Sequence, residues 1–215
     1  MRASRGFTLI ELMVAIAIMA LLALMSWRGL EGMARAQAQN RERGDAVLTL
    51  QTTLTQWSAD LDATVALAQI RALDWDGRVL RLTRRSTDTA SPVVYVVAWT
   101  LRADAAAGAR WHRWQSPGIT SRPEWQQAWD QAAAWAQDSG AETQGADVAL
   151  VPLAGWQLYY FRNSVWAPAV SADELGAATP SPDGIRLVLN LPPGPALAGP
   201  LTKDWVRPAA TAPKS

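Results

Sequence analysis

The chain has 215 residues, a formal net charge of +1 and only 18% charged residues, so it lacks the basic footprint of a nucleic-acid-binding protein. It contains no cysteine, which excludes disulfides and thiol chemistry, and its single histidine excludes a multi-histidine metal site within one chain. Bulky aromatic surface comes almost wholly from 12 tryptophans.

An apolar run dominates the N-terminal region. Residues 7–25 are apolar except for Thr8 and Glu11, and no proline interrupts them. A helix of roughly 20 such residues crosses a hydrocarbon core about 30 Å thick. The run therefore predicts a membrane-spanning helix over residues 7–30. Arg2 and Arg5 precede it and place the N-terminus in the cytoplasm by the positive-inside rule, although arginines also follow the run.

Glu11 stands out because a carboxylate inside a membrane helix costs at least a few kcal/mol unless it is paired. One interpretation is that its side chain reaches the lipid headgroups from a position near the helix end. The other is that a cation meets it. No lysine or arginine follows Glu11 within one helical turn, so such a cation has to come from elsewhere.

The residues around Glu11 resemble the N-terminus of type IV prepilins and pseudopilins. Arg2 and Arg5 lead to Gly6, and Phe7-Thr8-Leu9-Ile10-Glu11 then opens the apolar helix. The resemblance implies that a prepilin peptidase cuts after Gly6 and that the amine of Phe7 is methylated. It also implies that Glu11 pairs with the terminal amine of a neighbouring subunit. An ordinary secretory signal is instead cut after its apolar region, which is then lost.

A second helical pattern follows the apolar run. Apolar residues recur at steps of three and four, which indicates an amphipathic helix: Val47, Leu50, Leu54, Trp57, Leu61, Val65 and Ala68. We therefore expect one helix from about residue 7 to residue 69, whose second half packs on a soluble domain. A coiled coil is the alternative, but the pattern lacks the e/g charges typical of one.

From residue 73 onward the period changes to two, and Asp76-Gly77 between apolar flanks predicts a hairpin. A helix is predicted over 122–138, with Trp125 and Trp129 on its core face. The expected strands cover 79–84, 92–102, 110–115, 148–151, 156–162, 165–167 and 185–191. The predicted fold is α+β, a long helix packed on antiparallel sheet. The predicted divisions are a leader (1–6), a membrane and assembly helix (7–30), a periplasmic domain (31–195) and a mobile proline-rich tail (196–215).

Several short motifs of the soluble part resemble the J-type minor pseudopilin of the type II secretion system. They are Ser26 to Leu30 at the end of the span, Leu48 to Leu61 with its terminal Asp-Leu followed by Arg71, the aromatic segment Gly155 to Trp166, and Gly184 to Leu189. The tryptophan-rich segment 122–138 matches no pattern of that family.

Two patterns could carry other chemistry. Asp74-x-Asp76-Gly77 is similar to the opening of a calcium loop, but Arg85 stands where the closing acid belongs, which favours a hairpin turn. The segment Arg110 to Trp114 alternates cations and aromatics, as single-strand nucleic-acid sites do, yet it also fits a half-buried strand. His112 has no adjacent nucleophile, so no catalytic constellation, metal site or cofactor is predicted.

The sequence therefore predicts a structural protein rather than an enzyme: a minor pseudopilin at the tip of a type II secretion pseudopilus. Its expected partners are other minor and major pseudopilins and the prepilin peptidase, with no nucleic acid. Its expected location is the bacterial inner membrane, with a single span and a periplasmic C-terminal domain. The alternative is a minor pilin of a type IV pilus or of a competence pseudopilus that takes up DNA, in which Arg110 to Trp114 would touch DNA. A single-pass membrane enzyme is a third class.

Overall fold

The computed structural model describes residues 7–87, 93–104, 108–137, 145–171, 181–194 and 196–208. The chain divides into two compact units, residues 1–45 and 46–215. Helix α1, Leu9–Asp62, contributes residues to both units.

The first unit consists of the N-terminal part of α1 and the residues before it. Every large apolar side chain from Phe7 to Met33 is more than half exposed, and Phe7 is 89% exposed. By length and composition, α1 is the one helix among the described residues that could cross a membrane. A helix that is apolar all round needs lipid or other helices around it.

Helix α1 ends at Asp62, so the predicted end at residue 69 was wrong. The reason is backbone pairing with a strand. Thr64 forms an isolated bridge with Arg84, and the Val65 N–H donates to the Thr83 carbonyl at 2.9 Å. Of the predicted apolar stripe, Leu50, Trp57 and Leu61 are buried and Leu54 is half-buried, whereas Val47 is 42% exposed.

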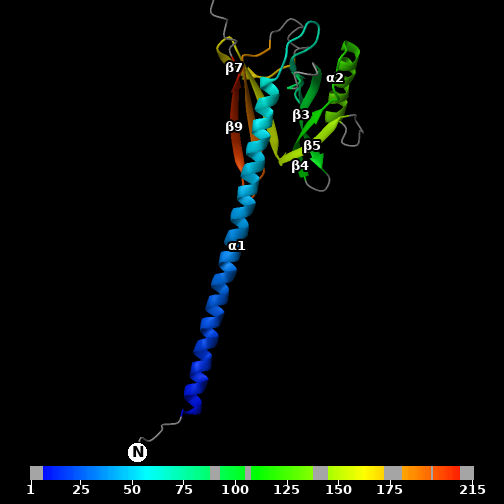
Figure 1. Cartoon of the computed structure of the whole chain (residues 1–215). Coiled ribbons are helices and arrows are strands. Elements are labelled where there is room, and N and C mark those ends of the chain that lie inside the picture. The colour runs from blue at the N-terminus through cyan, green and yellow to red at the C-terminus, as the bar shows by residue number, and fades with distance from the viewer. Residues whose placement is uncertain are drawn as a thin grey trace, which may run out of the picture. The chain divides into compact units, whose positions relative to one another are not determined.

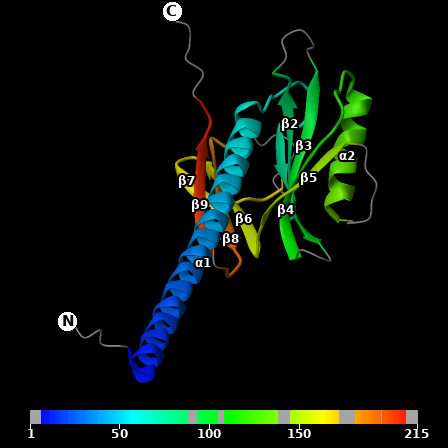
Figure 2. The same ribbon diagram turned by 60° about the horizontal axis from the view of Figure 1, so that its bottom comes forward.

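The second unit contains two antiparallel sheets and a second helix (Figures 1 and 2). One sheet has the order β1-β2-β3-β4-β5, formed by Leu73–Trp75, Val79–Arg85, Val94–Asp104, Gly108–Gln115 and Ala146–Pro152. The other has the order β7-β6-β8-β9, formed by Val165–Pro168, Gly155–Arg162, Gly184–Leu191 and Gly199–Val206. Helix α2 is Arg122–Gln137. The predicted α+β fold is confirmed.

Strand β9 contradicts the prediction that residues 196–215 form a mobile tail. All eight residues of β9 pair with β8, from Leu191 opposite Gly199 to Gly184 opposite Val206. Pro200 lies in this edge strand, where a missing N–H is tolerated. The prolines suggested a tail because they break strands in most other positions. Residues 209–215 lie outside the described part of the chain.

The five-stranded sheet has a hydrophobic cluster on each face. On one face, Trp57 and Leu61 of α1 pack with Trp99, Trp111 and the inner side of the four-stranded sheet. On the other face, Trp114 packs with the residues that α2 buries, which are Trp125, Ala128, Trp129, Ala132, Trp135 and Ala136. Figure 2 shows α2 beyond the five-stranded sheet and the end of α1 between the two sheets. The predicted core face of α2, with Trp125 and Trp129, is confirmed, although the prediction did not include Trp135.

A fully buried carboxylate, Asp60, joins α1 to the five-stranded sheet. Arg113 donates to it through Nε at 2.7 Å and Nη2 at 3.0 Å, and Arg84 Nη1 donates at 2.8 Å. Trp99 Nε1 at 3.0 Å and Gln56 Nε2 at 2.9 Å complete its hydrogen bonds. Arg84 is therefore part of a buried ion cluster, and only 17% of its side chain is exposed.

Candidate functional site

The candidate site is the segment that begins α1. Thr8 precedes the first helical residue, Leu9, and is the N-cap, which places Glu11 at the third helical position. The Thr8 N–H and Thr8 Oγ1 both donate to Glu11 Oε2 at 2.9 Å. The Glu11 N–H donates in return to Thr8 Oγ1 at 3.4 Å. This reciprocal pair is a capping box, which satisfies two N–H groups that the first turn would otherwise leave unpaired.

The capping box fixes the Glu11 side chain and uses only one of its carboxylate oxygens. Oε2 accepts both hydrogen bonds, whereas Oε1 accepts none from the described residues, and Glu11 forms no ion pair with them. One oxygen is therefore free to accept a hydrogen bond from an incoming cation. The T-x-x-E pattern of Thr8 and Glu11 is the sequence signal for this geometry, and it is independent of the charge of Glu11.

The predicted cleavage lies between Gly6 and Phe7. Gly6 is outside the described residues, so the geometry of this peptide bond is not described. Phe7 and Thr8 precede the helix, and Phe7 is almost fully exposed. Charge returns after the apolar run with exposed Arg28 and with an exposed ion pair, one helical turn apart, between Glu31 and Arg35. The cleavage, the methylation of Phe7 and the ion pair of Glu11 stay predictions.

The Asp74-x-Asp76-Gly77 pattern is a hairpin turn, as favoured from the sequence. Asp76 Oδ1 accepts the N–H groups of Arg78 and Val79 at 2.9 and 2.8 Å, and Gly77 has a φ of 89° that glycine adopts readily. Asp74 is buried and pairs with Arg81 at 2.9 Å. Within the described ranges, no three acidic, histidine or cysteine side chains are grouped as a metal site would need.

The segment Arg110 to Trp114 lies inside strand β4, as predicted. Trp111 and Trp114 are fully buried in opposite clusters, and the side chains of His112 and Arg113 are each 13% exposed. Arg113 pairs with Asp60, and His112 Nδ1 lies 3.0 Å from Asp147 Oδ1. These rings are not available for stacking on bases.

Asp147 interacts with polar groups of β3, β4 and α2. Besides His112, it accepts hydrogen bonds from Arg102 Nη1 at 2.9 Å and Trp135 Nε1 at 3.2 Å. Partial burial acts to raise the pKa of Asp147. The hydrogen bonds from His112 and Trp135, together with the charges of His112 and Arg102, outweigh burial and lower this pKa below its ordinary value of 3.8. Asp147 therefore favours its charged form and holds the tryptophan-rich helix against the sheet.

Comparisons with known proteins give a sequence match and a fold match. Residues 1–27 match the prokaryotic N-terminal methylation motif. A comparison with curated proteins found no match. The fold is similar to that of a chain in the crystal structure of the GspK-GspI-GspJ complex from the type 2 secretion system of enterotoxigenic Escherichia coli. The TM-score is 0.50 at 14% identity, over 77% of this chain and 99% of that chain. At this identity the likeness shows the fold alone.

Proposed function

We propose that this chain is a minor pseudopilin of a type II secretion system. The observation that carries the proposal is the match of residues 1–27 to the N-terminal methylation motif at the head of an exposed apolar helix. The fold shared with a chain of the GspK-GspI-GspJ complex supports it. The finer assignment, a J-type subunit near the filament tip, is supported by the short motifs in α1, β6 and β8.

In this proposal, the first six residues are a leader that a prepilin peptidase removes. Phe7 becomes the methylated N-terminus, residues 7–30 anchor the subunit in the inner membrane, and the second unit lies in the periplasm. The partners are other minor and major pseudopilins, and the chain carries out no catalysis of its own. When subunits assemble, their apolar helices leave the lipid and bundle together, which keeps the exposed side chains from Phe7 to Met33 away from water.

Glu11 sets the axial register between subunits. The capping box keeps one carboxylate oxygen on Thr8 and leaves the other for the terminal amine of a neighbour. A subunit displaced along the axis would leave two charges unmatched among apolar side chains, at a cost of at least a few kcal/mol. Because this chain has Glu11, we place it beneath or beside another subunit rather than alone at the apex.

The alternative with DNA uptake is less well supported. The segment that would touch DNA, Arg110 to Trp114, is largely buried, and Arg113 is occupied by Asp60. An electrophoretic mobility shift with single-stranded DNA separates the two functions, since we expect no binding at physiological salt.

Mass spectrometry of the protein purified from its host tests the processing. We expect a chain that starts at Phe7 and carries one methyl group on its amine. Gly6→Leu should block the cut, because the peptidase site resembled here requires a small residue before the bond. Gly29→Leu is the matched control, since Gly29 has open space around it and lies in the helix itself. A retained Met1, or a cut after Met25, would refute the proposal.

Co-purification tests the role of Glu11. Glu11→Leu should leave processing and membrane insertion intact but reduce recovery of partner pseudopilins and lower secretion. Glu31→Leu removes the same charge farther along the helix, from an exposed pair with Arg35, and should have little effect. Wild-type secretion by the Glu11→Leu protein would contradict the pairing.

A further inference from the structure

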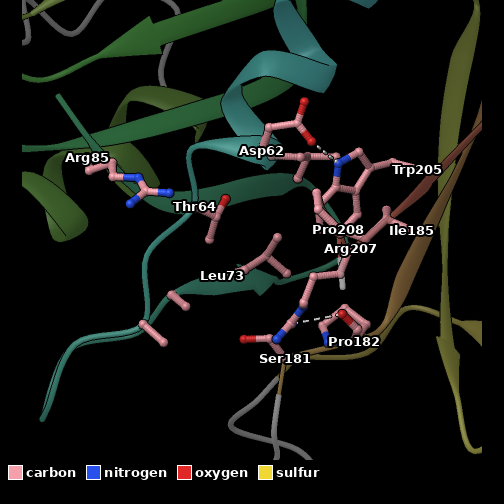
Figure 3. A pocket seen from close by; sticks show the side chains of 13 residues that line it. Asp62, Thr64, Leu73, Arg85, Ser181, Pro182, Ile185, Trp205, Arg207 and Pro208 are labelled. Carbon is pink, nitrogen blue, oxygen red and sulfur yellow. Dashed lines mark hydrogen bonds between the residues drawn. The ribbon is translucent and has the colours of Figure 1, made fainter. Parts of the chain in front are cut away.

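A pocket of about 310 Å³ lies in the second unit, where the C-terminal end of α1 meets the ends of both sheets (Figure 3). This volume falls within the range of small-ligand sites, about 300 to 1,000 Å³. Its apolar lining is formed by Leu61, Leu73, Ile185 and the indole of Trp205. The proposed processing and assembly at the N-terminus do not use this pocket.

The indole wall of the pocket is held in place by a hydrogen bond. Trp205 Nε1 donates to Asp62 Oδ1 at 2.7 Å, which links β9 to the last residue of α1 (Figure 3). The second carboxylate oxygen of Asp62 accepts no hydrogen bond from the described residues. It can therefore accept an N–H group from a ligand.

Two guanidinium groups line the same pocket. Arg207 Nη2 donates to the Pro182 carbonyl at 2.9 Å, which fixes the side chain and leaves its other N–H groups available (Figure 3). The guanidinium of Arg85 has no hydrogen bond or ion pair within the described part of the chain. By contrast, Arg81 and Arg84 of the same strand each pair with an aspartate. The pocket thus contains two cationic side chains against one carboxylate.

These groups select the charge of a ligand. A guanidinium binds a carboxylate or a phosphate through parallel hydrogen bonds. However, Asp62 and the carbonyl end of α1 also border the pocket, and both repel negative charge. Repulsion grows with the charge of the ligand, so a singly charged carboxylate is favoured over a phosphate dianion. The apolar lining favours a carboxylate that carries an apolar group.

We propose that this pocket binds the C-terminal residue of another polypeptide. Arg207 would bind its terminal carboxylate, and Asp62 would accept its main-chain N–H. Arg85, which lies apart from Arg207 across the pocket, would add positive charge (Figure 3). Its apolar side chain would lie between Trp205 and Leu73. A chain end offers these three groups on one residue, which matches the three kinds of lining. This inference does not depend on the proposed role in secretion.

Fluorine NMR of the full chain in detergent micelles tests the proposal. The tryptophans are labelled as 5-fluorotryptophan, and Trp205→Phe identifies the Trp205 resonance. The probes are acetyl-Gly-Gly-Leu, its C-terminal amide, N-acetyl-leucine and inorganic phosphate. We expect the acid tripeptide to shift the Trp205 resonance saturably. The amide should bind at least about tenfold more weakly, because charge-assisted hydrogen bonds are lost.

Variants locate the binding. The double variant Arg85→Gln/Arg207→Gln should weaken binding of the acid tripeptide by about tenfold or more. Arg78→Gln is the matched control, because Arg78 is exposed in the β1–β2 turn and does not line the pocket. The remaining tryptophan resonances report whether each variant keeps its fold.

Four results would overturn the proposal. The acid tripeptide and its amide could bind equally well, or the double variant could bind the acid tripeptide as tightly as wild type does. Phosphate could bind where the tripeptide does not, or N-acetyl-leucine could bind where the tripeptide does not. The last two would assign the pocket to small anions. Deletion of residues 209–215 is a further arm. If this deletion strengthened tripeptide binding about tenfold or more, residues 209–215 of the same chain would be the occupant of the pocket. The proposal that another polypeptide binds there would then be wrong.

Discussion

Removal of the buried charge on Asp60 should strongly destabilise the second unit. Asp60 is fully buried, and it accepts hydrogen bonds from Arg113, Arg84, Trp99 and Gln56. Asp60→Asn keeps the size of the side chain but removes its charge. It also points N–H groups at two guanidinium groups, which donate hydrogen bonds and cannot accept them.

The magnitude follows from the burial of the two arginines. Loss of one partner from a buried ion pair costs about 3–5 kcal/mol, because the other charge stays in the protein without compensation. Only 13% of the Arg113 side chain and 17% of the Arg84 side chain are exposed, so water can replace little of the lost interaction. We expect about 3–5 kcal/mol, a large part of the 5–15 kcal/mol that is typical of a domain.

Chemical denaturation of residues 31–215 measures this change, with tryptophan fluorescence as the signal. This fragment contains the whole second unit, and we expect it to be soluble and folded because its core lies within residues 46–215. In thermal unfolding, the same variant should melt roughly 6–20 °C lower.

Asp62→Asn is the matched control for Asp60→Asn, with the same chemical change one half-turn farther along α1. Asp62 is exposed and loses only the bond to Trp205, so the cost should be about 1 kcal/mol or less. Equal costs for the two variants would refute the conclusion that Asp60 holds α1 on the sheet. Replacement of Asp60, Arg84 and Arg113 together by apolar residues should recover part of the stability, because no buried charge is then left unpaired.

Three further predictions concern the core, the acid range and the helix start. Trp57→Ala should lower the free energy of unfolding by about 3–5 kcal/mol, whereas Val47→Ala should change it little because Val47 is 42% exposed; an unchanged urea midpoint for Trp57→Ala would mean that α1 does not pack as described. Because the pKa of Asp147 is lowered in the folded protein, its charged form stabilises the fold at pH values above the ordinary pKa of 3.8, and this stabilisation is lost as the pH falls through the folded-state pKa. Denaturation at several pH values should therefore show that Asp147→Asn is less stable than wild type at neutral pH and loses less stability on acidification. Thr8→Ala removes the N-cap and should speed amide exchange at residues 9–12 in micelles, with a cost of about 1 kcal/mol that Thr8→Ser should restore; identical exchange in Thr8→Ala and wild type would exclude the capping box in solution.

Features that rest on neighbours in sequence could be predicted from the sequence. The Asp76-Gly77 hairpin, the tryptophan face of α2 and the apolar span each follow from a local pattern. The alternation in β4 was also predicted, since Trp111 and Trp114 lie on opposite faces of the sheet. Strand β9 could not be predicted, because Pro200 is acceptable only in an edge strand and the sequence does not show which strand is at the edge.

The different environments of the two aspartates at the end of α1 could not be predicted from the sequence. Asp60 and Asp62 are two residues apart in one helix, yet one is fully buried and the other is exposed. Their partners come from distant strands: Arg113 lies 53 positions from Asp60, and Trp205 lies 143 positions from Asp62. The helix ends at Asp62 because the backbone of residues 64 and 65 pairs with β2. The same pairing places the end of α1 beside Arg85, so the pocket and the buried ion cluster both depend on contacts that no local pattern encodes. The capping box at the other end of the helix links residues three apart, and its T-x-x-E pattern could be identified from the sequence alone.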